Sequence, residues 1–141
     1  DLHSFPTRRS SDLPTVNGRP IGVSAETEMR KALIATGFPY SVCDEADEIC
    51  SRLRRVLEAS QGVRRFGSAA IDLAYTACGR FEGFYETSLK PWDTAAGWLL
   101  VEEAGGRVSG MDGKDYDFSG HMIVASNGHV HEALLELLRR D

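Results

Sequence analysis

Residues 86–97 read ETSLKPWDTAAG, and this stretch indicates the fold class of the chain around it. Residues 81–86 (FEGFYE), which lead into it and share Glu86, have the aromatic-rich pattern of a strand. Pro91 is typical of the first turn of a helix, and Gly105-Gly106 is typical of a helix end, so we expect a helix over residues 92–104. A strand that turns directly into a helix is the repeating unit of α/β proteins.

The same stretch places a carboxylate where it can do chemistry. Asp93 falls in the first turn of the expected helix, where its charge complements the helix dipole. Ala95, Ala96 and Gly97 keep that turn nearly bare, which leaves room for a ligand. Mg²⁺ prefers carboxylate oxygens and completes its shell with water and substrate phosphate. An ordinary helix start, with alanines that serve only close packing, explains the same residues.

Two further segments could bind a ligand, although each also has a purely structural explanation. Gly67, Ser68 and Ala69 open the preceding helix, where free N–H groups can bind a phosphate or a hydroxyl. Ser68 is equally typical of a simple N-cap. Glu86 ends a strand, where it could accept hydrogen bonds from sugar hydroxyls or be a solvated surface group. His129 and His131 lack the i, i+4 spacing of a helical metal site, and we assign them no role.

The rest of the chain continues the alternation of strands and helices. Asn17-Gly18 predicts a hairpin, with a returning strand over residues 19–23. Further strands are expected over residues 31–36, 62–65, 107–109 and 122–125, and further helices over 44–58, 68–79 and 129–140. This order predicts the α/β class, with a mixed sheet flanked by helices.

Composition narrows the class of protein. The 141 residues include 42% hydrophobic and 26% charged residues, as in a single globular domain, and the net charge is -5. An acidic chain is a poor candidate for binding nucleic acid or an anionic membrane. No apolar run reaches the roughly 18 residues of a membrane span, and no signal peptide is visible. Cys43, Cys50 and Cys78 have no metal or redox spacing and are expected to be reduced, so we expect a cytoplasmic protein.

The first thirteen residues differ in character from the rest. They read DLHSFPTRRSSDL, show no helical or strand period, and resemble translated sequencing adapter. We expect residues 1–13 to be foreign to the protein, or else a disordered tail, and residues 14–141 to be native.

Taken together, the motifs resemble one family. WDTAAG (residues 92–97) resembles the W-D-x-A-A-G motif of the inositol monophosphatase family. GSAA (67–70), GR (79–80), FYE (84–86), EAGG (103–106) and ASN (125–127) follow the family's order and spacing. The resemblance extends over residues 16–140.

The resemblance implies a fold and an activity. It implies a magnesium-dependent phosphatase with a layered α/β/α/β/α architecture, often dimeric, that acts on inositol monophosphate or a related sugar phosphate. By resemblance, Asp93 is a metal ligand that also contacts a substrate hydroxyl, and Gly67, Ser68, Ala69 and Glu86 contact the inositol ring. No separate catalytic side chain is assigned in this chain.

The sequence also departs from the family. The D-P-x-D-G-T motif and an upstream glutamate, which supply the family's other metal ligands, are not found. We therefore expect the C-terminal half of the domain, inactive alone, with a partly exposed apolar face. Substrate alternatives are fructose bisphosphate, histidinol phosphate and adenosine bisphosphate. A non-catalytic partner of the transcription machinery is an alternative of another class.

Overall fold

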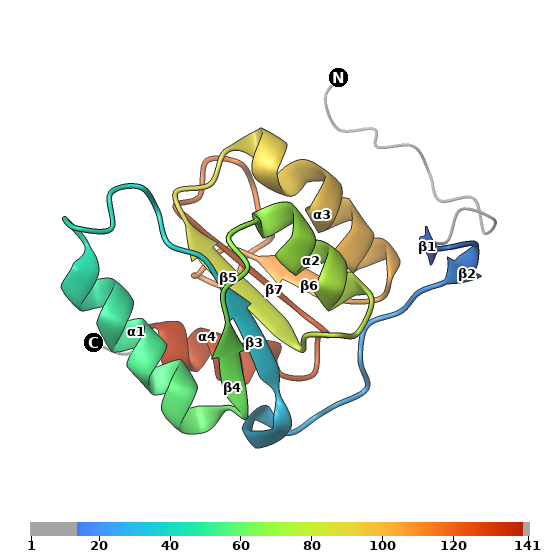
Figure 1. Cartoon of the computed structure of the whole chain (residues 1–141), viewed down its shortest axis with the longest axis horizontal. Coiled ribbons are helices and arrows are strands. Elements are labelled where there is room, and N and C mark those ends of the chain that lie inside the picture. Colours follow the sequence, from blue (N-terminus) through green and yellow to red (C-terminus); the bar gives the residue numbers. More distant parts are fainter. Residues whose placement is uncertain (1–13, 140–141) are drawn as a thin grey trace.

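A mixed five-stranded sheet forms the centre of the molecule, in a computed structural model that describes residues 14–139 (Figure 1). Its order is β4 (Gly62–Arg64), β3 (Leu33–Thr36), β5 (Gly83–Thr87), β7 (Met122–Ser126) and β6 (Arg107–Ser109). β3 runs parallel to both β4 and β5, whereas β7 runs antiparallel to β5 and β6. The predicted mixed sheet is confirmed.

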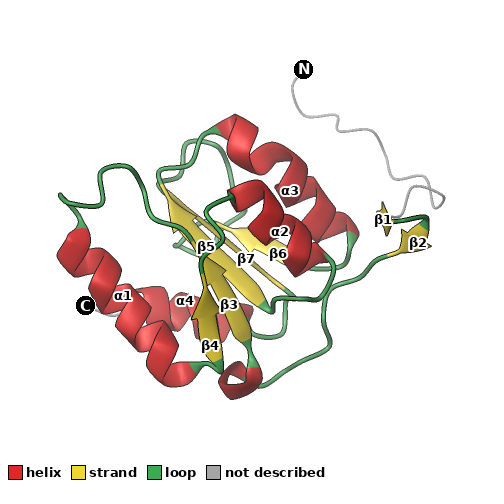
Figure 2. Ribbon diagram, viewed as in Figure 1, coloured by secondary structure: helices red, strands yellow, loops and turns green. Residues whose placement is uncertain are grey.

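Helices cover both faces of this sheet (Figure 2). α2 (Ala69–Ala77) and α3 (Pro91–Glu103) pack on one face, and α1 (Ala46–Ala59) and α4 (His131–Arg139) on the other. Neighbouring strand residues face opposite layers: Phe84 contacts the α2–α3 side and Tyr85 the α1–α4 side. The central strands are therefore apolar on both faces, and the predicted α/β class is confirmed.

The N-terminal hairpin is shorter than expected. β1 (Thr15–Val16) pairs with β2 (Arg19–Pro20) through Asn17 and Gly18, which adopt φ angles of 52° and 74°. The returning strand was expected to reach residue 23. Instead the Val23 N–H donates to the Ala104 carbonyl at 3.2 Å, which directs the chain to the end of α3.

The last helix begins later than expected, for a specific reason. The Asn127 side-chain oxygen accepts hydrogen bonds from the N–H groups of His129 (3.0 Å) and Val130 (3.2 Å), so α4 starts at His131. The Asn127 amide donates to the Glu26 carbonyl at 2.8 Å and so also holds the segment that precedes β3.

His131, which received no role from the sequence, is a buried structural residue. Its ring nitrogens lie 2.8 Å from the hydroxyl oxygens of Ser109 and Ser126, and the side chain is fully buried. Burial lowers the pKa of His131 to about 4, with a further lowering by Arg107. The imidazole is therefore neutral in the folded chain at neutral pH.

The outer surface of α2 and α3 carries exposed apolar side chains. Ile71, Trp92 and Leu99 are 47%, 80% and 54% exposed, respectively. A partly exposed apolar face was expected from the sequence, and this face and its effect on solubility or association stay predictions. Within residues 14–139, no helix is both long and apolar enough to cross a membrane.

We predict that His131 lowers the free energy of unfolding of the chain as the pH becomes acidic. An unfolded histidine titrates near its ordinary value of 6.5, above the folded pKa of about 4, so the unfolded state takes up the proton first. The free energy of unfolding should therefore fall as the pH drops from 6.5 to 4. His131 alone should account for a loss of about 3 kcal/mol.

Urea denaturation of the wild type and of His131→Gln at several pH values measures this effect. The stability difference between the two should shrink as the pH falls, whereas His129→Gln, at an exposed position, should show no such trend. A constant difference for His131→Gln would contradict the assignment.

Candidate active site

Parallel pairing of β3 and β5 brings two functional segments to one edge of the sheet. Thr36, the last residue of β3, pairs with Tyr85 of β5. Gly37, which follows β3, and Glu86, the next residue of β5, therefore lie side by side. The carboxyl ends of parallel strands are where α/β proteins most often bind ligands.

A cavity of about 350 Å³ opens at this edge. It is lined by all five residues that the sequence singled out for binding: Gly67, Ser68, Ala69, Glu86 and Asp93. The other lining residues are Gly37, Phe38, Tyr40, Arg65, Ala70, Leu89 and Trp92. Residues from the start of α2, the end of β5 and the start of α3 thus meet in one place.

The start of α3 fixes the orientation of Asp93. Lys90 is the N-cap residue, and its backbone N–H donates to the Asp93 Oδ2 atom at 2.9 Å. Pro91 follows with the φ angle that a first turn needs. Asp93 is half-buried and lines the cavity, so its carboxylate is held in place while it remains accessible.

The start of α2 presents backbone N–H groups to the same cavity. Gly67 has a φ of 79°, a conformation that favours glycine, and directs the chain into the helix. Ser68 occupies the N-cap position, but its side chain makes no capping hydrogen bond in the described structure, so the interpretation of Ser68 as an ordinary side-chain cap is wrong. The first-turn N–H groups therefore have no serine hydroxyl as partner, and Ala69 and Ala70 both line the cavity.

Glu86 is half-buried rather than a solvated surface group. A Cβ atom on Gly37 would lie 2.1 Å from the Glu86 Oε2 atom, so the carboxylate occupies the space that a side chain at residue 37 would fill. Burial raises the pKa of Glu86 to about 7, and the charges of Asp72 and Asp93 raise it further, while Arg65 lowers it.

Asp72 is a residue of this region that matches the family's sequence pattern but received no role in the sequence analysis. It lies on the buried side of α2, is 0% exposed, and neither carboxylate oxygen has a hydrogen-bond partner within residues 14–139. Burial raises the pKa of Asp72 to about 6. The sequence held one sign of this burial: Asp72 falls at helical spacing with Ala69, Leu73 and Thr76, on the side of α2 that faces the core.

The carboxylates of this region are not close enough to form a complete metal site. Within the described chain, no three His, Cys, Asp or Glu side chains converge to hold a metal ion. Asp93 lines the cavity, whereas Asp72 is buried and does not line it. Direct ligands besides Asp93 would have to come from solvent, substrate or other protein segments.

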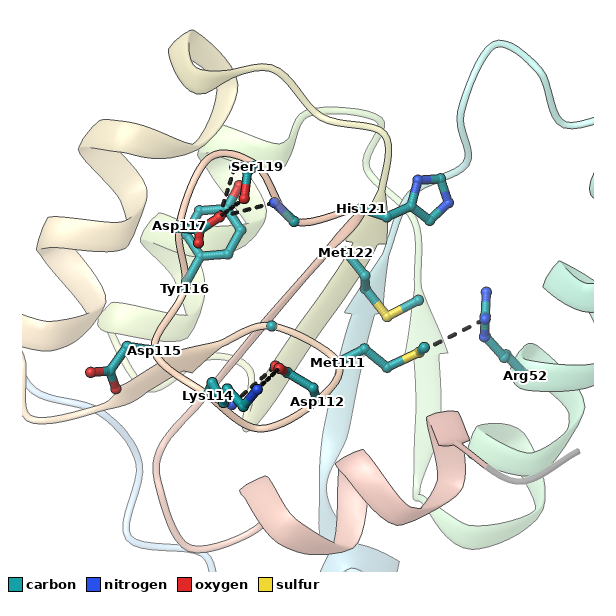
Figure 3. A pocket seen from close by; sticks show the side chains of 12 residues that line it. Arg52, Met111, Asp112, Lys114, Asp115, Tyr116, Asp117, Ser119, His121 and Met122 are labelled. Carbon is teal, nitrogen blue, oxygen red and sulfur yellow. Dashed lines mark hydrogen bonds and ion pairs between the residues drawn. The ribbon is translucent and has the colours of Figure 1, made fainter.

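A second, larger cavity lies between the 110–121 loop and α1 (Figure 3). Its volume is about 460 Å³, and it shares no lining residue with the Asp93 cavity. Its polar groups bind one another: Asp117 Oδ1 accepts from the Ser119 N–H at 2.8 Å, and Lys114 lies 3.5 Å from Asp112. Figure 3 also shows Arg52 directed at Met111, 3.8 Å from its sulfur. Asp117 and Lys114 are therefore each paired with a neighbouring residue of the same loop.

The fold is that of an α/β protein with a carboxylate-lined cavity at the carboxyl edge of two parallel strands of its sheet. The sequence pattern of the inositol monophosphatase family matches residues 12–141. The chain belongs to the inositol monophosphatase family.

Relatives of known sequence agree with this assignment. The chain is 44% identical to an inositol-1-monophosphatase of Synechocystis sp. over 124 residues, which cover 88% of this chain and 43% of that protein. It is 43% identical to a putative Nus factor SuhB of Neisseria meningitidis over 123 residues, which cover 87% of this chain and 47% of that protein. The chain thus spans less than half the length of these relatives.

Solved structures have the same fold. An inositol monophosphatase from Anabaena (Nostoc) sp. superposes with a TM-score of 0.86 at 41% identity, over 91% of this chain and 51% of that one. The extragenic suppressor protein suhB from Bartonella henselae superposes with a TM-score of 0.86 at 39% identity, over 92% of this chain and 50% of that one.

We predict that Gly37→Ala displaces Glu86 from its half-buried position, because the new methyl group would overlap the carboxylate. The pKa of Glu86 should then fall from about 7 toward 4.5, as the group moves into solvent. Carboxyl ¹³C NMR titration measures this pKa directly.

Gly22→Ala is the matched control, because the nearest atom to its added Cβ lies at an ordinary 3.8 Å. Its Glu86 titration should match that of the wild type. An unchanged Glu86 titration in Gly37→Ala would contradict the steric argument.

Proposed function

We propose that this chain is part of a magnesium-dependent phosphatase that hydrolyses inositol monophosphate or a related sugar phosphate. The observation that carries the proposal is the Asp93 cavity, where Asp93, Glu86 and the start of α2 meet. The family membership and the relatives named inositol-1-monophosphatase support the reaction class.

The lining groups suit the parts of such a substrate. Asp93 would hold the metal ion and contact a substrate hydroxyl, since its carboxylate is accessible and fixed by Lys90. The N–H groups at Gly67, Ser68 and Ala69 are suited to donate hydrogen bonds to ring or phosphate oxygens. Glu86 would accept hydrogen bonds from ring hydroxyls when it is ionised.

The charges of the site fit a divalent cation. Asp72 and Asp93 both raise the pKa of Glu86, Arg65 lowers it, and the Asp72 oxygens have no hydrogen-bond partner within residues 14–139. Bound Mg²⁺ would supply positive charge to activate water and to stabilise the leaving oxygen at phosphorus.

We further propose that residues 14–141 are the C-terminal part of a longer phosphatase domain and that they are inactive alone. Two observations support this: the relatives are about twice as long, and the described carboxylates do not make a complete metal site. Residues 1–13, proposed to be foreign, lie outside the described residues. The family often forms homodimers, and we propose the same for the longer protein, in the cytoplasm and without a nucleic-acid or membrane ligand.

A second candidate function is a non-catalytic role with the transcription machinery. The observation that favours it is the 43% identity to a protein named putative Nus factor SuhB. Fructose bisphosphate, histidinol phosphate and adenosine bisphosphate stay as alternative substrates of the phosphatase.

The test of the proposed function is an assay of the longer protein, obtained by sequencing the source DNA upstream of the Pro14 codon. Release of phosphate from inositol monophosphate should require Mg²⁺, and Asp93→Asn should lower kcat/KM by about 10²-fold or more, because a metal contributes several kcal/mol to such a reaction. The 141-residue chain should release no phosphate above background.

Comparison of the four phosphate esters identifies the preferred substrate. Phosphate release by the isolated chain, or no release by the longer protein from any ester, would contradict the proposal. RNA polymerase binding by the longer protein that survives Asp93→Asn, with no phosphatase activity, would support the second candidate instead.

A further inference from the structure

Ser88 has a backbone conformation that residues with a side chain rarely adopt. Its φ is 61°, and within residues 14–139 the one other non-glycine residue with a positive φ is Asn17, in the N-terminal hairpin. Asparagine tolerates this left-handed region, whereas serine is strained there. The Ser88 side chain is exposed and makes no hydrogen bond within the described chain, so no local contact offsets the strain. Strain of this kind persists where the surrounding structure requires it, most often at functional sites.

The strained residue lies where the chain leaves the sheet. β5 ends at Thr87, and the Ser88 N–H donates to the His121 carbonyl at 2.8 Å, which extends the pairing of β5 with β7 by one residue. α3 begins only three residues later, at Pro91. The chain must therefore turn from a strand into a helix within residues 88–90, and the positive φ of Ser88 is the point at which it turns.

This short connection determines where Asp93 lies. The Lys90 N–H donates to Asp93 Oδ2, and the Asp93 N–H donates to the Lys90 carbonyl, each at 2.9 Å, so the two residues are bound to each other. Leu89, between Ser88 and Lys90, packs against the core and lines the Asp93 cavity. A different chain direction at Ser88 would therefore move Lys90, and with it the Asp93 carboxylate, relative to Glu86 of β5.

We propose that Ser88 is a positioning residue for Asp93, and that its left-handed turn sets the separation of the Asp93 and Glu86 carboxylates in the cavity. The Ser88 hydroxyl is not required for this role. Glycine should serve better, because it adopts a positive φ without strain, and a β-branched residue should fail. The inference rests on the role proposed above for Asp93, since the position of this carboxylate matters only if it binds a ligand or a cation.

The first test compares the melting temperatures of Ser88→Gly and Ser88→Val in the 141-residue chain. Glycine removes the strain and should raise the melting temperature by about 2 °C. Valine, with its branched Cβ atom, should lower it by about 4 °C or more. Gln61→Val is the control, because Gln61 is exposed and lies outside the left-handed region, and it should melt within about 2 °C of the wild type.

The second test follows the Lys90 amide by NMR, because its hydrogen bond to Asp93 reports the geometry of the turn. An amide that donates to a carboxylate is shifted downfield and protected from exchange. In Ser88→Val the signal should move toward its position in Asp93→Ala, where the acceptor is gone, and should exchange about tenfold faster. Ser88→Gly should keep the wild-type signal. If Ser88 served stability alone, valine would lower the melting temperature without changing this amide.

An unchanged Lys90 amide in folded Ser88→Val would overturn the proposal, as would a Ser88→Gly chain that melts below the wild type or loses the signal. If circular dichroism shows that Ser88→Val does not fold, Ser88→Thr, which is also β-branched and closer in size to serine, replaces it. None of these measurements requires turnover. Absence of phosphatase activity in the longer protein, with the Lys90 amide behaving as expected, would therefore refute the proposed function alone.

Discussion

The parallel pairing of β3 with β5 is the constraint on which the site depends. It sets Gly37 beside Glu86, and the missing side chain of Gly37 provides the space for the Glu86 carboxylate. α2 leads into β5 and α3 follows it, so the helix starts that carry Ser68 and Asp93 flank the same strand. One strand pairing thus collects groups that lie up to 56 residues apart, from Gly37 to Asp93, into one cavity.

The energetics of this cavity differ from those of the rest of the fold. On the opposite face of the sheet, His131 is buried but fully hydrogen-bonded by two serine hydroxyls, which is the usual condition of a buried polar group. Asp72 is as deeply buried and has no partner, and Glu86 is half-buried beside like charges. Unbalanced carboxylates of this kind are costly for folding and useful for binding a cation, which is why they point to function.

Much of this arrangement could be predicted from the sequence. The hairpin at Asn17-Gly18, the helix after Pro91 and the strand before Glu86 follow from local turn chemistry and side-chain pattern, and all are present. The binding residues came from a motif whose order and spacing resemble one family. Asp72 and His131 could not be assigned, because their roles depend on burial and on partners that are distant in the sequence. The start of α4 also depended on Asn127, whose capping role competes with helix propensity at residues 129 and 130.

The central claim is that the Asp93 cavity, and not the larger cavity beside the 110–121 loop, binds a phosphorylated ligand together with a cation. Amide NMR of the 141-residue chain, titrated with millimolar inositol monophosphate and Mg²⁺, tests it most directly. The account predicts shifts at Gly67, Ser68, Ala69 and Asp93 that require Mg²⁺, with the amides of residues 110–121 unchanged. Shifts confined to residues 110–121, or shifts at the Asp93 cavity that are the same without Mg²⁺, would contradict it.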